Sequence, residues 1–147
     1  MESNHIFLVA TAVFCWFSTG VSWLLQLVTY PTFKFLSEEN SCLFYNSFNG
    51  RLLKTVKIPM FLGNILMLIL VAFHPETCPM GLIYLTALCS ILIIFTTLKY
   101  EFPNRKVLEK AGKNKDLMGV LLKNNLTQSI GWTISSLSLA YMILKMI

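Results

Sequence analysis

The sequence predicts an all-α integral membrane protein, a single domain over residues 1–147 built as an antiparallel bundle of four transmembrane helices. Hydrophobic residues make up 55% of the chain and the mean hydropathy is +0.64, whereas soluble domains hold about 45 to 50% apolar residues. The apolar residues fall in four runs comparable with the ~20 residues that cross a bilayer core. These runs are residues 6–30, 58–73, 80–98 and 126–146.

The first run, Ile6–Tyr30, contains no Asp, Glu, Lys, Arg or His. Its small and polar side chains recur every three or four residues, which places them on one face of a helix. We expect that face to pack against other helices and the rest to face lipid. The face consists of Thr11, Cys15, Ser18, Ser22, Gln26 and Thr29. Because no Lys or Arg precedes this run and no A-x-A site follows it, no cleavable signal peptide is expected.

Two prolines and a serine divide the next part of the chain. Pro31 is expected to end the first helix, since proline has no N–H for the next hydrogen bond. Ser37, followed by Glu38 and Glu39, is typical of the start of a new helix. This amphipathic helix is expected on the inner membrane surface. Pro59 either begins the second transmembrane helix or kinks a continuous one.

The first loop carries a row of basic residues. Arg51, Lys54 and Lys57 are three apart, so they are predicted to lie along one side of the amphipathic helix. Like charges stacked in this way repel one another, and anionic lipid headgroups would offset the repulsion. This row is therefore the predicted contact with the membrane surface.

The remaining loops are short or helical. Prolines bound the turn at residues 74–79, so the second and third helices should be antiparallel neighbours. The third loop holds two helical segments, Asn104–Ala111 and Asp116–Lys123, separated by Gly112. We expect both loops with helices to lie on the same side of the membrane.

Polar and small residues within the later runs are predicted to join the helices. Asn64 is expected to hydrogen-bond across helices to Gln26, Ser22 or Ser135, or else to face a substrate. Residues of this kind let transmembrane helices approach and bond to one another. The predicted packing residues are Ser18, Ser22, Gln26, Asn64, Ser90, Gly131 and Ser135, the last two within the spacing Thr127-x3-Gly131-x3-Ser135.

The charges predict the orientation of the chain. The first and third loops hold eleven Lys or Arg against five Asp or Glu, whereas the outer segments hold one Lys against two Glu. Cytoplasmic loops carry the excess of Lys and Arg. Both termini are therefore expected outside and loops one and three in the cytoplasm. Asn125-Leu-Thr127 matches the glycosylation pattern, but this orientation predicts that it stays unmodified.

The residue types in the four runs argue against several functions. No ionisable residue of the kind that proton relays and ion-coupled transporters use lies within them, and no His is present there to ligate haem. His5, His74, Glu76 and Cys78 are metal-ligating types, but their spacing repeats no known ligand pattern. We therefore expect no metal, no cofactor, no nucleic-acid partner and no disulfide within the chain.

Polar side chains are expected to converge at the inner mouth of the bundle. A basic, aromatic-lined mouth suits an amphiphile with an anionic head; the alternative is ordinary positively charged flanks with aromatic anchors. The predicted ligand-contacting or headgroup-contacting residues are Tyr30, Arg51, Lys54, Lys57, Tyr100, Asn104, Arg105 and Asn125. Glu101 and Asn124 are expected at the same depth.

The segment Phe102-Pro103-Asn104-x3-Leu108, followed by residues 121–125 (LLKNN), resembles the small four-helix membrane family related to fungal anthrone oxygenases. The resemblance implies oxygenation of polycyclic aromatic substrates without an obvious metal, with Asn104 as a polar site residue, or, as for many bacterial relatives, no assigned activity. Family members carry a Trp and a basic or His residue at the start of the fourth helix. This chain has Asn124, Asn125, Gln128 and Ser129 there, and so lacks the expected proton acceptor.

The sequence favours a non-catalytic accessory or assembly subunit that contacts anionic lipids and packs into a homo-oligomer or a larger membrane complex. The alternative is a membrane-embedded, oxygenase-like enzyme acting on a hydrophobic or amphiphilic substrate at the cytoplasmic mouth. A third hypothesis is a small oligomeric pore. The residues alone do not decide whether the chain is an enzyme.

Overall fold

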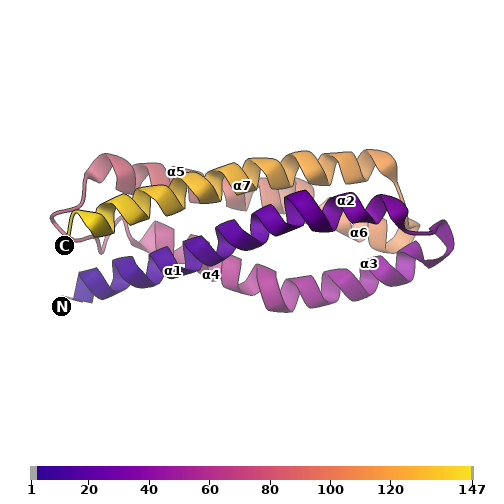
Figure 1. Cartoon of the computed structure of the whole chain (residues 1–147), viewed down its shortest axis with the longest axis horizontal. Helices are drawn as coiled ribbons and strands as arrows, with labels where there is room; N and C mark the ends of the chain where they lie inside the picture. The colour runs from indigo at the N-terminus through magenta and orange to yellow at the C-terminus, as the bar shows by residue number, and fades with distance from the viewer. Residues whose placement is uncertain (1–2, 147) are drawn as a thin grey trace.

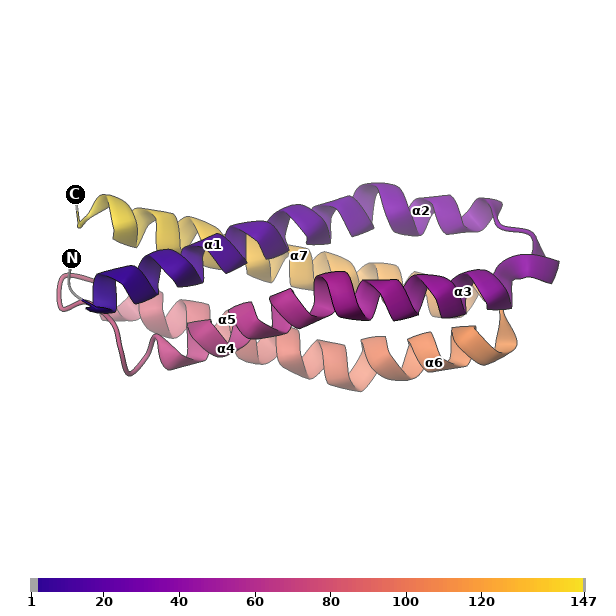
Figure 2. The same ribbon diagram turned by 90° about the horizontal axis from the view of Figure 1, so that it is seen from below.

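The structure, a computed structural model, describes residues 3–146, and no strand occurs within that range. The prediction of an all-α chain is confirmed. Helical segments join end to end into four rods that lie side by side, with the two chain ends at the same end of the bundle (Figure 1). The rods alternate in direction along the chain, and the same arrangement is seen from below (Figure 2).

Each of the first three rods combines several helical segments. The first rod contains α1 (Ser3–Leu24), the π turn η1 (Leu25–Thr29), α2 (Tyr30–Thr32) and the 3₁₀ turn η2 (Phe33–Phe35). The second contains α3 (Glu38–Leu52), the π turn η3 (Leu53–Lys57) and α4 (Ile58–Ile69). The third contains α5 (Met80–Thr96), the π turn η4 (Thr97–Glu101) and α6 (Phe102–Ala111). The fourth rod is the single helix α7 (Lys115–Leu144).

The rods form a four-sided bundle in which α1 packs against α4 and α7, and α5 packs against the same two helices. The apolar core has two parts. One lies toward the chain ends and includes Met67, Trp132 and Leu139. The other lies toward α3 and α6 and includes Tyr45 and Leu108. Polar side chains, described below, lie between these two parts.

Three rods are long and apolar enough to cross a membrane: Ser3–Phe35, Glu38–Ile69 and Met80–Ala111. They have 33, 32 and 32 residues, which at ~1.5 Å per residue gives about 50 Å. A bilayer hydrocarbon core is about 30 Å thick. Each rod is therefore long enough to cross the core and extend well beyond it.

The helices in the first and third loops differ from the predicted surface helices. Figure 2 shows α3 in line with α4, and α6 in line with α5, so they lengthen the bundle instead of lying across its end. Ser37 lies at the N-terminus of α3, where a helix start was predicted. The predicted break between the two helical segments of the third loop is also present, because α6 ends at Gly112 with φ +76°.

Three prolines, Pro31, Pro59 and Pro103, lie within the rods and do not end them. The prediction that Pro31 ends the first helix is wrong. Each of Pro31, Pro59 and Pro103 is the second residue after a π turn, and the rod continues past it. A proline within an α-helix lacks one N–H and its ring clashes with the carbonyl four residues earlier. In the π turn the preceding residue bonds five residues back, as Tyr30 N–H does to the Leu25 carbonyl. The wider turn accommodates the proline without a break.

Candidate functional site

A buried carboxylate at mid-length of the bundle is the centre of a polar network. Glu101, at the end of η4, is 2% exposed. Its Oε1 lies 2.6 Å from Lys57 Nζ and 2.8 Å from Arg105 Nη2. Its Oε2 accepts a hydrogen bond of 3.1 Å from Gln128 Nε2. All of its partners are hydrogen-bond donors, which suits an ionised carboxylate.

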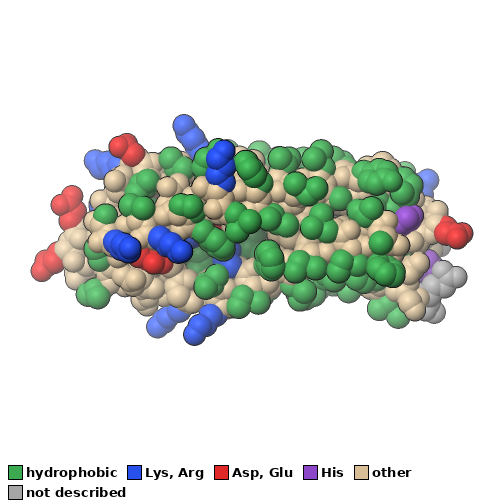
Figure 3. Space-filling view, turned by 180° about the vertical axis from the view of Figure 1, so that it is seen from behind, with side chains coloured by type: hydrophobic (Ala, Val, Ile, Leu, Met, Phe, Trp, Pro, Cys, Tyr) green, Lys and Arg blue, Asp and Glu red, His purple; other side chains and the backbone are tan. Residues whose placement is uncertain are grey.

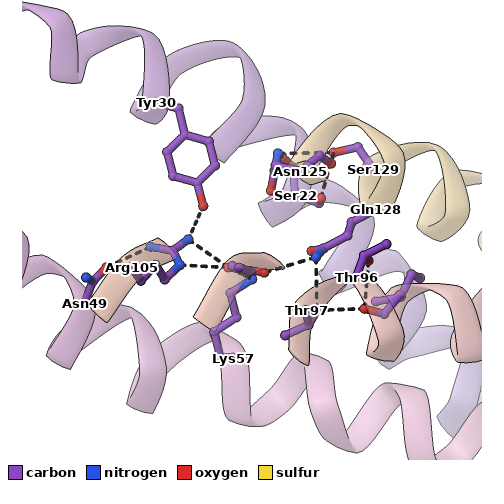
Figure 4. A network of polar contacts seen from close by, with 12 residues as sticks. Ser22, Tyr30, Asn49, Lys57, Thr96, Thr97, Arg105, Asn125, Gln128 and Ser129 are labelled. Carbon is purple, nitrogen blue, oxygen red and sulfur yellow. Dashed lines mark hydrogen bonds and ion pairs between the residues drawn. The ribbon is translucent and has the colours of Figure 1, made fainter. Parts of the chain in front are cut away.

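The network joins all four rods (Figure 4). Arg105 donates to Asn49 Oδ1 at 2.8 Å and to the Tyr30 hydroxyl oxygen, and so it connects the third rod to the second and the first. Gln128 of α7 also donates to Thr97 Oγ1 at 3.0 Å. A polar layer that contacts every rod fixes their relative depth, because a shift of any rod would leave buried groups without partners.

The polar layer contains more basic than acidic side chains. Lys57 and Arg105 are 9% and 7% exposed and share the single buried carboxylate of Glu101. The next acidic side chain, Glu109, is half-buried and accepts a 2.9 Å hydrogen bond from Asn49. Glu109 therefore reaches Arg105 only through that amide. With Lys57 and Arg105 both protonated, two cations and one carboxylate give the buried cluster one excess positive charge.

A second polar cluster joins α1 to α7 beside the first (Figure 4). Asn125 Nδ2 donates to the Ser22 carbonyl and to Gln26 Oε1, each at 3.0 Å. The hydroxyls of Ser22 and Ser129 are 2.7 Å apart. Asn125 is 3% exposed, so the folded chain does not present its amide for glycosylation on either side of a membrane.

A cavity of about 340 Å³ lies between α4 and α5 with α7 at its floor. Exposed apolar side chains form its outer lip: Leu53, Ile58, Phe61, Leu98 and Phe102. Buried side chains form its floor: Lys57, Met60, Asn64, Ile93, Gln128 and Trp132. Figure 3 shows this face, where the hollow lies at the border between the mostly hydrophobic part of the surface and the part that carries Lys and Arg.

Several predicted ligand-contacting residues lie outside this site. Arg51 and Lys54 are exposed, unlike Lys57, so the predicted row of three along one side is wrong. The π turn η3 lies within this row and rotates Lys57 inward. Tyr100 is 40% exposed and half-buried Asn104 does not line the cavity. Tyr30, Lys57 and Arg105 meet in the first cluster, and Asn125 lies in the second.

The predicted packing residues are mostly inside the bundle, with partners that differ from those expected. Asn64 Oδ1 accepts from Ser90 Oγ at 3.0 Å, so Asn64 joins α4 to α5, and within residues 3–146 it forms no hydrogen bond with Gln26, Ser22 or Ser135. A Cβ on Gly131 would meet Ile93 Cδ1 at 3.3 Å, so α5 and α7 approach closely there.

Other predicted residues form no inter-rod bond. Ser18 donates to the Phe14 carbonyl of its own helix at 2.7 Å. Ser135 Oγ is buried without a hydrogen-bond partner among the described residues.

The four cysteines are free thiols, and Cys78 is buried at 5% exposure. Within residues 3–146, no group of three or more His, Cys, Asp or Glu is close enough to hold a metal ion.

Sequence reasoning missed two members of the network and gave Glu101 no specific role. Asn49 is on the inward side of α3, where it contacts both Arg105 and Glu109. Gln128 was noted only as a departure from the family pattern. The available signal was the spacing of Glu101 and Arg105, four residues apart, which is typical of a helical ion pair.

Comparison with known proteins gave no matching family model, no matching curated protein and no matching solved structure.

Proposed function

We propose that this chain is an integral membrane protein that binds an apolar or amphiphilic molecule taken from the bilayer. The observation that carries the proposal is the cavity between α4 and α5, with its apolar lip and a floor that includes Lys57 and Gln128. Ligand pockets are typically apolar with a few polar groups that orient the ligand, and have volumes of about 300 to 1,000 Å³. The cavity fits this pattern at the lower limit of size.

We propose that all four rods cross the membrane. The support is a belt of exposed hydrophobic side chains on every rod, within residues 6–28, 58–73, 80–98 and 126–144. At ~1.5 Å per residue the stretches on the first, third and fourth rods measure about 27 to 33 Å, comparable with the ~30 Å of a hydrocarbon core. On the second rod the helical part is Ile58–Ile69, and the chain continues through the turn at residues 70–73. None of these stretches contains Asp, Glu, Lys or Arg.

The helix α7 is less apolar than the other rods for a structural reason. Its buried side is rich in Ser, Asn and Gln, which bond to the neighbouring rods. Its outward side is hydrophobic and includes Leu126, Ile130, Ile134 and Leu137. The outward side of a transmembrane helix is the one that contacts lipid, so this composition is compatible with a fourth crossing.

The proposed orientation places the α3 and α6 end of the bundle in the cytoplasm and the turn at residues 74–79 outside. The excess of Lys and Arg at the α3 and α6 end supports it. In a variant with Cys42→Ser, we expect Glu76→Cys to react with an impermeant maleimide in intact cells and Lys110→Cys to react only after permeabilisation. The opposite pattern would reverse the orientation, and equal labelling of both would contradict the four crossings.

Ligand uptake can be tested through Trp132, which forms the cavity floor and is fully buried. With Trp16→Phe and Trp23→Phe it becomes the single tryptophan. In nanodiscs, brominated single-chain amphiphiles should quench its fluorescence saturably, whereas brominated phospholipids should not. Ile94→Phe, which fills the cavity, should weaken binding about 5- to 150-fold, as about 1 to 3 kcal/mol of overpacking predicts.

The matched control for this test is Ile91→Phe, which lies on the same helix but exposed and away from the cavity. It should leave binding unchanged. No saturable quenching by any brominated amphiphile would overturn the proposed function. Quenching that is equal in the Ile94 variant would place the ligand outside the cavity.

The anthrone-oxygenase resemblance gives a second candidate, an enzyme acting on the bound molecule. Its support is that Lys57, which lines the cavity, contacts the carboxylate of Glu101. Incubation of the reconstituted protein with a polycyclic anthrone and O₂, followed by mass analysis, tests it. The accessory role, with Arg51 and Lys54 contacting anionic lipid, and the oligomeric pore remain predictions from the sequence.

A further inference from the structure

We infer that the ligand of the cavity is a single-chain amphiphile with a carboxylate head, and that the ammonium group of Lys57 binds this head. The inference rests on the proposed function, because it concerns the molecule that the cavity takes up. It adds the chemical class of that molecule and names the residue that selects it.

Charge complementarity favours an anionic head when Lys57 and Arg105 are both protonated. Glu101 is the only carboxylate among residues 3–146 that lies within ion-pair distance of Lys57 or Arg105. Buried cations without an equal number of anions are strongly unfavourable. A second anion beside this cluster would balance its charge, whereas a cationic head would add to the excess.

Of the two buried cations, Lys57 is the one that a ligand in the cavity can reach. Arg105 is engaged by Glu101, Asn49 and Tyr30, and it does not line the cavity. Lys57 does line the cavity, and within the described part of the chain its ammonium has one acceptor, Glu101 Oε1. An ammonium group has three N–H donors. Two donors of Lys57 therefore remain for a ligand.

Among the donors that line the cavity, the Lys57 ammonium is the charged one, and most of the neutral donors are already used. Gln128 Nε2 donates both hydrogens, to Thr97 and to Glu101. Asn64 Nδ2 donates to the Met60 carbonyl at 3.1 Å. The neutral donors that remain are Trp132 Nε1, which is buried without a described partner, and the second hydrogen of Asn64 Nδ2. The lysine ammonium is thus the strongest donor that the cavity offers, and it favours an acceptor with a negative charge.

The volume of the cavity favours a ligand with a single hydrocarbon chain. The cavity of about 340 Å³ is at the lower limit of ligand pockets, which run from about 300 to 1,000 Å³. It suits one hydrocarbon chain, whose far end can leave through the apolar lip of Phe61 and Leu98 into the bilayer. A headgroup with two acyl chains would need a wider opening. We therefore assign the site to a single-chain carboxylate.

The test compares three brominated amphiphiles of the same chain, a fatty acid, a fatty alcohol and a fatty amine, by quenching of Trp132 in nanodiscs of zwitterionic lipid. At a pH where the acid is ionised, the acid should bind about tenfold tighter than the alcohol, and the amine weakest. Lys57→Met should remove the preference for the acid while the alcohol still binds. This substitution leaves Glu101 paired with Arg105, so the network keeps balanced charges.

The control is Lys54→Met, which removes an exposed charge one turn away and should keep the preference. Equal binding of acid and alcohol, or a preference that survives Lys57→Met, would overturn the inference and leave the proposed function intact. Displacement of the acid by an equimolar two-chain anionic phospholipid would overturn the single-chain assignment. Absence of saturable quenching by all three amphiphiles would instead overturn the proposed function itself.

Discussion

Replacing Glu101 with Gln should destabilise the bundle strongly although the two side chains have nearly the same shape. The carboxylate accepts from Lys57, Arg105 and Gln128, and all three partners present donors. An amide would point an NH₂ group at one of these donors and would leave two buried cations without an anion. Breaking a buried pair by removing one partner costs about 3 to 5 kcal/mol.

At about 2 to 4 °C per kcal/mol for a chain of this size, Glu101→Gln should lower Tm by about 6 to 20 °C. Thermal unfolding in mild detergent, followed by circular dichroism, measures it. Adding Lys57→Met to Glu101→Gln removes one of the uncompensated cations and should recover part of the loss. Such a rescue separates electrostatic from steric effects, since coupled neighbours are non-additive.

The matched control is Glu109→Gln on the same rod. Glu109 is half-buried and its carboxylate has a single described hydrogen bond, from Asn49. Loss of this hydrogen bond should lower the free energy of unfolding by about 1 kcal/mol. If Glu101→Gln lowers Tm no more than Glu109→Gln does, the buried cluster does not carry the charges described here and the reasoning is refuted.

Three further predictions use the same unfolding assay or a labelling rate. Gly112→Ala should lower the free energy of unfolding by about 1 to 3 kcal/mol, because its φ is +76° and the new Cβ would lie 2.5 Å from the Ser41 hydroxyl oxygen. A Tm no lower than that of the wild type would contradict the strained turn. Asn125→Ala should lower the free energy of unfolding by about 1 to 3 kcal/mol, because hydrogen bonds between α1 and α7 are lost. Asn124→Ala should lower it clearly less, because Asn124 Nδ2 is buried without a described partner. Burial raises the pKa of the Cys78 thiol, so its alkylation should be slow at neutral pH and should accelerate as pH rises and the thiolate forms; rapid labelling at pH 7 would show that this turn opens.

The arrangement of the rods was largely predictable, because hydropathy reports which side chains can face lipid. Most of the exposed large hydrophobic side chains fall within the predicted runs, and up to residue 144 the runs contain no Asp, Glu, Lys or Arg. The exceptions lie in the first and third loops and are Phe35, Leu43, Phe44, Leu53, Tyr100, Phe102, Val107 and Val120. Hydropathy does not report where a helix ends. Lys57 and Glu101 lie just beyond the runs, where they were expected at the inner mouth of the bundle, with Lys57 contacting a ligand or lipid headgroups. Because the rods continue past these positions, the same residues are inside a longer bundle.

The pairing within the site could not be predicted from spacing. Lys57 and Glu101 are on different rods, so only the relative depth and rotation of the rods bring their side chains to 2.6 Å. Asn64 illustrates the same limit, since it lies on the predicted inward face but bonds to Ser90 of the adjacent rod. Sequence periodicity identifies a face of one helix, and it does not identify which residue of another helix lies opposite.

The prolines explain how charged side chains come to be buried at this depth. Each π turn adds one residue to the helical turn, which rotates the following segment by about 100° relative to a regular helix. Lys57 and Glu101 are the last residues of their π turns, and Tyr30 directly follows a third. Without the extra residue, Lys57 would follow the exposed face of Lys54. Pro31, which was expected to end a helix, thus marks together with Pro59 and Pro103 the level at which three rods turn polar side chains toward one another. The polar layer lies there, and so does the part of the cavity floor formed by Lys57 and Gln128.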